Sequence, residues 1–470
     1  MDFKQHLAKL TLLVAGVLLL TASSPKDEPR VWTSGSQPLK EMEQVRKLIK
    51  APVFKNKDFN ITDYGAKGDG VTKNTEAFRK AIEACNKAGG GRVIVPAGKF
   101  FTGPIYLKSN VNLHLQDNSV IIFSRDTKDY PLVLVRWEGM DCMNYSPQIY
   151  AYGEENIAVT GSGLLDGNAD QNNWWPWKRG TPSQAKARDS LHVLMRQKVD
   201  PRKRVFGDGH YLRPYMLQPY NCKNLLISGV RMINSPMWFI SPVMCENVTI
   251  EKVRVESHGP NTDGCDPDAC RNVLIKDCYF DTGDDCIAIK SGRDEDGRGF
   301  GRPAENHIIE GCIMKDGHGG IVIGSEIAGG ARNIYAINCK MSSPELDRVL
   351  RIKTSSSRGG IIENVFMKDV QVGTYKDAAI WFNMFYENPG KYIPTIRNIW
   401  VENLDVEAGG DFAIYARAYK ESPVQHLKLV NCNIRGVKKA VDADHVKDVD
   451  LRNVKINGQV FTLPASLKNK

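Results

Sequence analysis

The sequence has no Cys-x-x-Cys pair and no histidine cluster, although it contains 11 Cys and 9 His residues among 470. Structural zinc sites are built from such closely spaced ligands, so the sequence gives no support for a metal site. The glycine-rich stretch Gly89–Gly91 lacks the Gly-Lys-Ser/Thr ending of a phosphate-binding loop, and it follows a predicted helix where that loop would precede one. We therefore expect neither a metal nor a cofactor.

Long apolar runs are also missing, except near the N-terminus. Lys4 and Lys9 precede an apolar run from Leu10 to Leu20, and small residues follow it. The run is shorter than the roughly 20 residues that span a bilayer, which favours a cleaved export signal over an anchor. We expect a signal peptide over residues 1–24, a linker over 25–55 with a short helix around 39–49, and a single folded domain over 56–465. The mature protein should be exported, to the periplasm or the extracellular space, and should have no membrane span.

The charge balance is mildly basic. The formal net charge is +9, with 42% hydrophobic and 25% charged residues. Such a surface suits a polyanion, which can be nucleic acid, an acidic membrane surface or an acidic polysaccharide. Charge alone fits a surface with a small excess of lysine equally well.

Internal repetition dominates the chain after residue 220. A polar residue, commonly Asn, recurs at intervals of 22 to 34 residues and is followed by alternating apolar residues. The repeats begin at Asn224, Asn247, Asn272, Asn306, Asn333, Asn364, Asn398, His426 and Asp448. Units of this length, made of short strands without helical periodicity, predict a parallel β-helix in which each unit stacks on the last. A propeller is the rival, but its blade period of about 40 residues is too long.

The cysteines fit the stacked units. Cys278, Cys312, Cys339 and Cys432 each follow a repeat start by six residues, where other units place Val or Leu. This position predicts a column of small apolar side chains in the core, with the cysteines as free thiols. Cys265 and Cys270, which lie five residues apart, are the better disulfide candidates.

The segment from about 59 to 123 should cap the open end of the β-helix. Asn74 is placed to N-cap an amphipathic helix that has Phe78, Ile82 and Cys85 on one face. A cap is needed because an open end would expose the core and unpaired strand edges. The predicted fold is thus all-β, a parallel β-helix with a short N-terminal helical cap.

Four short segments carry acid/base chemistry. They are Asn261-Thr262-Asp263, Gly283-Asp284-Asp285, Gly317-His318-Gly319 and Arg351-Ile352-Lys353. Asp284 and His318 both lie twelve residues after a repeat start, so they should occupy the same corner of neighbouring coils, about 5 Å apart. Asp263 precedes Asp285 by about one coil. Alternation should place Arg351 and Lys353 on one face with Ile352 inward, and both aspartates can act only if the chain bends between them.

In this order the four segments resemble glycoside hydrolase family 28, the polygalacturonases and related pectin-degrading enzymes, over about residues 56–460. The resemblance implies a right-handed parallel β-helix over a catalytic domain at 56–465. It also implies Asp284 as general acid, and Asp263 and Asp285 as the carboxylates that activate water with inversion at the anomeric carbon. His318 would support the acid. The substrate-binding residues would be Arg351, Lys353, Asn261 and Tyr386, with the two cations facing a sugar carboxylate.

The expected partner is an acidic plant polysaccharide, pectin or polygalacturonate, bound by a monomer with no nucleic acid. Rhamnogalacturonan or xylogalacturonan are alternative substrates. A calcium-dependent pectate lyase and a non-enzymatic polysaccharide-binding β-helix are alternative functions.

The residues around the predicted site leave several points open. The segment 178–213 holds ten Lys or Arg against three Asp, so it is either a wall that favours exo action or a solvated loop. Trp174, Trp175 and Trp177 are candidates for sugar stacking or for anchoring that segment. Asp266 and Asp268 are expected to form turns.

Overall fold

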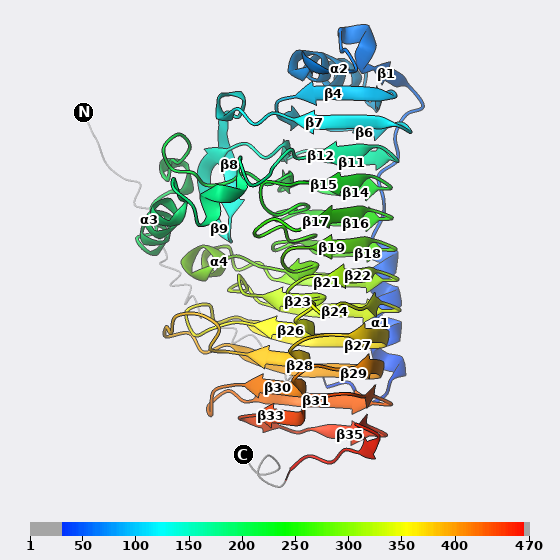
Figure 1. The fold of residues 1–470 in the computed structure, drawn as a ribbon, viewed down its shortest axis with the longest axis vertical. Coiled ribbons are helices and arrows are strands. Elements are labelled where there is room, and N and C mark those ends of the chain that lie inside the picture. Colours follow the sequence, from blue (N-terminus) through cyan, green and yellow to red (C-terminus); the bar gives the residue numbers. More distant parts are fainter. Residues whose placement is uncertain (1–30, 465–470) are drawn as a thin grey trace, which may run out of the picture. The chain divides into compact units, whose positions relative to one another are not determined.

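The computed structural model describes residues 31–464, which wind into a parallel β-helix (Figure 1). Successive coils add strands to the same sheets, and almost all neighbouring strands pair in parallel. The predicted right-handed β-helix is confirmed. The predicted signal peptide lies outside the described residues. Among residues 31–464, no helix has the length and apolar character that crossing a membrane requires.

The largest sheet has 26 strands in two columns. One column contains β1 (Asp58–Asn60), β3 (Gly91–Val95), β6 (Val111–Leu115), β11 (Glu155–Gly161), β14 (Lys223–Ser228), β16 (Glu246–Glu251), β18 (Arg271–Lys276), β21 (Ala304–Glu310), β24 (Ala331–Ile337), β27 (Ile361–Thr374), β29 (Thr395–Ala408), β31 (Val424–Val430), β34 (Val446–Lys447) and β35 (Asp450–Arg452). The other contains β2 (Asp69–Lys73), β4 (Gly98–Thr102), β7 (Ser119–Phe123), β12 (Leu164–Asp166), β15 (Arg231–Ile233), β17 (Arg254–Ser257), β19 (Tyr279–Thr282), β22 (Ile313–Asp316), β25 (Lys340–Met341), β32 (Asn433–Ile434), β36 (Lys455–Ile456) and β37 (Gln459–Val460).

A separate six-stranded sheet carries the candidate site. Its strands are β20 (Ile287–Ile289), β23 (Ile321–Gly324), β26 (Arg348–Lys353), β28 (Ala378–Asn383), β30 (Phe412–Arg417) and β33 (Lys439–Ala443). Earlier coils form a three-stranded sheet of β5 (Ile105–Tyr106), β10 (Ile149–Tyr152) and β13 (Leu217–Tyr220). Ile352 faces the core between Arg351 and Lys353, as the alternation predicts.

An asparagine ladder fixes the register of the coils. In the middle of the chain, Asn306 Nδ2 donates to Asn272 Oδ1 over 3.0 Å, and Asn333 Nδ2 donates to Asn306 Oδ1 over 3.0 Å. Each of these residues has a positive φ, which asparagine tolerates better than most residues. The recurring Asn is therefore the corner at which every coil turns, and it aligns the residues that follow it.

The core confirms one prediction about cysteine and overturns another. Cys278, Cys312, Cys339 and Cys432 are buried free thiols within the core. Cys265 and Cys270 are also free and buried, so the expected disulfide between them is absent and that prediction is wrong. Both face the same apolar interior as the other cysteines, where a thiol packs as a small hydrophobic group.

The N-terminal cap forms as predicted, with one difference at its first residue. Helix α2 (Thr75–Lys87) follows Asn74 and packs Phe78, Ile82 and Cys85 into the core. Asn74 makes no side-chain bond to the helix; its Oδ1 instead accepts from the Lys67 backbone N–H over 2.7 Å. The side chain thus holds the preceding loop, and the predicted capping bond is wrong. The 3-10 helix η1 (Ile61–Tyr64) completes this cap.

The N-terminal helix α1 (Ser36–Leu48) covers the outer face of the largest sheet. Met42 and Val45 of this helix, with Trp32 before it, are buried against Ile308, Tyr335, Phe366 and Trp400. Figure 1 shows α1 beside the strands of the middle coils. The described part of the predicted linker thus adds a second apolar layer, while the predicted boundaries at 24, 55 and 465 stay predictions.

Insertions between coils gather on the other side, beyond the six-stranded sheet (Figure 1). They comprise the hairpin of β8 (Leu132–Trp137) and β9 (Met140–Tyr145), and the helices α3 (Ala185–Arg196) and α4 (Asp294–Phe300). Short 3-10 helices η2 (Thr127–Asp129), η3 (Trp175–Lys178) and η4 (Pro201–Lys203) belong to the same region of the chain. The hairpin, α3 and α4 pack on one another and bury Trp137, Leu191 and Met195.

Candidate active site

A bend in the chain lets two adjacent aspartates reach one site. Residues 283 and 284 form a bend between β19 and β20. The Thr282 hydroxyl donates to the Asp284 carbonyl over 2.8 Å, and the Asp285 N–H donates to the Asp284 carboxylate over 3.0 Å. These bonds replace strand pairing locally, so the condition for both aspartates to act is met.

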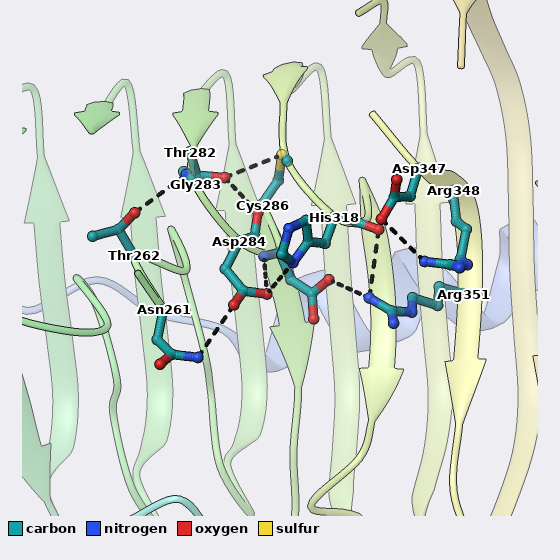
Figure 2. A network of polar contacts seen from close by, with 12 residues as sticks. Asn261, Thr262, Thr282, Gly283, Asp284, Cys286, His318, Asp347, Arg348 and Arg351 are labelled. Carbon is teal, nitrogen blue, oxygen red and sulfur yellow. Dashed lines mark hydrogen bonds and ion pairs between the residues drawn. The ribbon is translucent and has the colours of Figure 1, made fainter. Parts of the chain in front are cut away.

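Asp284 lies between Asn261 and His318 (Figure 2). His318 Nδ1 is 3.1 Å from Asp284 Oδ1, and Asn261 Nδ2 donates to Asp284 Oδ2 over 3.2 Å. The His318 backbone N–H also donates to the Asp284 carbonyl over 3.1 Å. The equal offset from Asn272 and Asn306 therefore brought Asp284 and His318 together on neighbouring coils.

Arg213 fixes the orientation of the Asn261 amide. Its Nη2 donates to Asn261 Oδ1 over 2.8 Å, which leaves Asn261 Nδ2 to donate to Asp284. Arg213 is fully buried, and burial lowers its pKa to about 10; this is still well above neutral pH, so the guanidinium stays charged. Sequence reasoning did not assign this role to Arg213.

Arg351 and Lys353 both pair with Asp285. Arg351 Nη1 is 3.0 Å from Asp285 Oδ1, and Lys353 Nζ is 2.6 Å from Asp285 Oδ2. All three side chains are buried. The cations lie on one face of β26, as predicted, and they neutralise a site carboxylate. Lys353 also lines the pocket described below.

Asp263 completes a set of three carboxylates. One oxygen from each of Asp263, Asp284 and Asp285 lies within 4.8 Å of the others. Asp263 is buried, and its Oδ1 has no hydrogen-bond partner among the described residues. Asp263 lies one coil before the adjacent Asp284 and Asp285, and the stacking predicted from the sequence brings the three side chains together.

The surroundings of the three carboxyls separate their pKa values. Burial raises the pKa of Asp263 well above its usual value, and the charges of Asp266 and Asp284 raise it further. Burial also raises the pKa of Asp285, but Lys353 and Arg351 outweigh it and bring that pKa far below the usual range. For Asp284, burial is outweighed by the hydrogen bond from His318, so its pKa is lowered. The same bond raises the pKa of His318. The pKa of Asp263 thus moves in the opposite direction from the pKa values of Asp284 and Asp285, and the titrations of Asp284 and His318 are linked through their hydrogen bond.

A pocket of about 620 Å³ opens at these residues. It is lined by Asn261, Asp263, Asp284, Lys353 and Tyr386 among the predicted residues. The Tyr386 ring lies 5.4 Å from the Arg351 guanidinium carbon and 5.3 Å from Lys353 Nζ. Tyr386, predicted on the weakest motif, therefore does stand at the site.

The inserted segment 178–213 lines the same pocket. Lys178 is the last residue of η3. Helix α3 contributes Arg188, Asp189, His192, Val193 and Arg196. The tryptophans before it serve as anchors: Trp174 is fully buried, and Trp175 Nε1 donates to the Ser235 carbonyl over 2.9 Å. Trp177 packs on Trp174 with ring centroids 4.8 Å apart. The segment 178–213 thus forms a wall of the pocket, and the three tryptophans anchor that segment.

Several charged residues beside the pocket escaped sequence reasoning. Asp266 and Asp268, expected in turns, are fully buried and face cations: Lys290 Nζ is 3.6 Å from Asp266, and Arg136 Nη1 is 2.8 Å from Asp268. The turn prediction is wrong because these residues pair across coils. Lys290 also bonds Glu326 over 3.1 Å, and Glu326 pairs with Arg293. No motif marks these residues, and only the alternation that continues from β20 into Lys290 could have suggested that Lys290 faces the site.

The three site carboxylates also have the spacing of a cation site, and so do His258, Asp281 and Asp316 nearby. Asp285 is already neutralised by two cations, which opposes a divalent ion at the first group. The second group is exposed or half-buried and lies outside the pocket.

Comparison with known proteins identifies the family. Residues 207–457, more than half of the chain, match the family described as Glycosyl hydrolases family 28. Residues 59–118 match a second one, Rhamnogalacturonase A/epimerase, pectate lyase-like. The chain belongs to glycosyl hydrolase family 28, and it is therefore a glycoside hydrolase by family.

Individual relatives agree with this assignment. A probable polygalacturonase of Vitis vinifera is 30% identical over 70% of this chain and 63% of its own length. An exo-poly-alpha-D-galacturonosidase of Dickeya chrysanthemi is 27% identical over 81% of this chain and 67% of its own length. The chain thus spans about two thirds of the length of these relatives. The crystal structure of a hyperthermoactive exopolygalacturonase from Thermotoga maritima is 42% identical, covering 90% of this chain and 97% of that one, with a TM-score of 0.88.

Proposed function

We propose that this chain hydrolyses α-1,4 galacturonosyl linkages in pectin or polygalacturonate and releases single sugars from chain ends. The observation that carries the proposal is the cluster in which three carboxylates lie beside His318 and two cations, next to a pocket lined by Asp263, Asp284, Lys353 and the inserted wall. The Dickeya relative, an exo-poly-alpha-D-galacturonosidase, and the Thermotoga relative, an exopolygalacturonase, support the same substrate class.

In this proposal, Asp284 is the general acid and His318 its proton partner. A charged His318 beside ionised Asp284 differs from neutral His318 beside protonated Asp284 only by proton movement along their 3.1 Å contact. The pair therefore keeps a proton available for the leaving oxygen although the pKa of Asp284 itself is lowered.

Asp263 and Asp285 hold the attacking water. A water molecule that donates to two oxygens at about 2.8 Å each can bridge atoms up to roughly 5.5 Å apart, and the carboxylate oxygens lie within 4.8 Å. Asp285 is kept ionised by Arg351 and Lys353, so its carboxylate can accept a hydrogen bond from the water and orient it. Water delivered from this side gives inversion. The carboxyl groups of inverting enzymes usually stand about 6.5–9.5 Å apart, which is farther than the 4.8 Å within which these oxygens lie. Proton NMR of the first anomer formed is therefore a direct test of inversion.

Lys353 and Tyr386 contact the substrate sugar at the cleavage point, with Asn261 beside them. Lys353 and Tyr386 line the pocket, while Arg351 lies behind them and acts through Asp285 and through the Tyr386 hydroxyl, 3.5 Å from its Nη2. A substrate carboxylate would share Lys353 with Asp285, which favours a uronate over a neutral sugar.

Export and assembly complete the proposal. We infer from the Lys4 to Ser24 pattern that the mature chain is exported and acts outside the cytoplasm. We expect it to act there as a monomer. Cell fractionation and sedimentation of the purified chain would test both statements.

Product analysis on polygalacturonate with a chelator present tests the function. Saturated galacturonate as the sole product would support an exo-hydrolase, and mixed oligomers would indicate endo action. An unsaturated product that disappears with chelator would instead indicate a calcium-dependent lyase. Inactivity would direct the assay to rhamnogalacturonan and xylogalacturonan, and inactivity on all three would favour a polysaccharide-binding β-helix.

A further inference from the structure

Two charged side chains in the pocket wall are withdrawn from water and have no partner among residues 31–464. They are Glu138, at the tip of the β8–β9 hairpin, and Lys178, at the end of η3. Among residues 31–464, neither the Glu138 carboxylate nor the Lys178 ammonium forms a hydrogen bond or ion pair. Other charged groups near the pocket, such as Lys290, Glu326 and Arg293, are paired.

Leaving these charges unpaired costs free energy, because both are withdrawn from water. Glu138 is 9% exposed, and Lys178 is half-buried. Burial lowers the pKa of Lys178, although the charges of Glu138 and Asp284 act in the opposite direction. A partly desolvated ion without a partner is unfavourable unless a ligand supplies one.

The backbone holds Glu138 in a conformation that a glutamate rarely adopts. It occupies the first position of a two-residue hairpin turn with φ +45, where Asn or Gly is usual. The Glu138 N–H donates to the Tyr215 hydroxyl over 2.8 Å, and its carbonyl accepts from Arg293 Nε over 2.9 Å. A Cβ on the next residue, Gly139, would lie 2.8 Å from the backbone nitrogen of Arg293. The tip of the hairpin therefore packs closely against residues of the site.

Lys178 is placed with similar rigidity. It follows directly from the anchored tryptophans, and the Trp175 ring fills the space beside Gly259, just before Asn261. The two unpaired charges are thus held by rigid elements on the wall, facing a pocket that Asp284 and Asn261 also line.

We propose that Glu138 and Lys178 bind the terminal uronate residue that the enzyme releases, Lys178 through the sugar carboxylate and Glu138 through the sugar hydroxyls. A lysine only donates hydrogen bonds and an ionised glutamate only accepts them, so each can take one of the two kinds of polar group on this sugar. A chain end carries a hydroxyl that an internal residue has used in a glycosidic bond, and Glu138 accepts from that hydroxyl.

This inference rests on the proposed function, and binding measurements separate the two. Calorimetric titration with free galacturonate and with neutral galactose would compare the wild-type chain with Lys178→Met, Lys178→Arg and Glu138→Gln. Lys186→Met and Asp208→Asn are matched controls, since both residues are exposed in the same inserted segment and lie outside the pocket.

Lys178→Met should weaken galacturonate binding about 10-fold or more and reduce the preference over galactose, since a charged hydrogen bond is lost. Lys178→Arg should restore much of the affinity for galacturonate. Glu138→Gln should weaken binding of both galacturonate and galactose. Unchanged affinity in both Lys178→Met and Glu138→Gln, with hydrolysis intact, would overturn the inference and leave the function standing. A wild-type chain that binds galacturonate through Lys178 but hydrolyses no galacturonan would keep the site and refute the function. Absence of both binding and hydrolysis would refute both.

Discussion

At the residue scale, the neighbouring side chains give the three carboxyl groups of the site different pKa values. The carboxylate of Asp284, the proposed acid, is hydrogen-bonded to His318 and Asn261. We expect Asp284→Asn to lower kcat by about 10²- to 10⁴-fold with little change in KM, because proton transfer is lost and the shape of the site is kept. Steady-state kinetics on polygalacturonate measure this. Asp281→Asn is the control, since that residue bonds His258 outside the pocket, and equal losses in the two variants would contradict the role of Asp284.

Asp263 should be a residue at which activity and stability conflict. Its folded pKa lies above the usual 3.8, so the folded state holds the proton more tightly than the unfolded state does. The stability contributed by this carboxyl is therefore lost as pH rises from about 3.8 through the folded pKa. Asp263→Asn cannot ionise, and its Tm relative to wild type should increase with pH across that window while activity is abolished. Thermal melts between pH 4 and 9 would show it; a constant difference would contradict the raised pKa.

The His318–Asp284 pair should contribute to stability only within a limited pH range. The pKa of His318 is raised above 6.5 in the folded state. Its contribution to stability is therefore complete below pH 6.5 and is lost as pH rises through the folded pKa. The pKa of Asp284 is lowered below 3.8, so its share is lost only in more acid solution. We expect His318→Asn to lower Tm most between about pH 4 and 6.5, and to approach wild type at higher pH. A Tm difference that is largest above pH 8 would be inconsistent with the pair.

At the element scale, the asparagine ladder joins the turn of each coil to the alignment of the site. Asn306 bonds the asparagines of both neighbouring coils and has φ +62. Asn306→Ala should destabilise the protein by about 2–4 kcal/mol, from two lost hydrogen bonds and an L-side chain in the left-handed region. Asn306→Gly loses the same bonds without the backbone cost, so it should be less destabilising by about 1 kcal/mol. Denaturant titration compares the two; equal effects would mean that backbone conformation is not limiting here.

At the scale of the whole molecule, helix α1 covers the face of the large sheet away from the pocket-lining insertions. Trp32, Met42 and Val45 are buried there, and burial of three such side chains contributes on the order of 5 kcal/mol. A chain that starts at Ala51 should melt at lower temperature and expose Tyr335, Phe366 and Trp400 to a hydrophobic dye, but it should retain hydrolysis below its Tm. Loss of hydrolysis in a truncated chain with an unchanged melting curve would show that α1 acts on the site.

The sequence by itself determined the repeat of the coils and the stacking of the candidate site residues. The asparagine interval sets where each coil turns, and equal offsets from it place Asp284 beside His318, because stacked coils repeat the same local geometry. Alternation along β26 places Arg351 and Lys353 on one face. Only the tertiary structure decided in which direction the pKa of each carboxyl moves, that Cys265 and Cys270 stay free, and that Asp266 and Asp268 pair with cations. It alone brought Glu138 and Lys178 to the pocket wall. These features depend on insertions that share no period with the coils, and on burial and charge contributed by residues far apart in the chain, which no local pattern encodes.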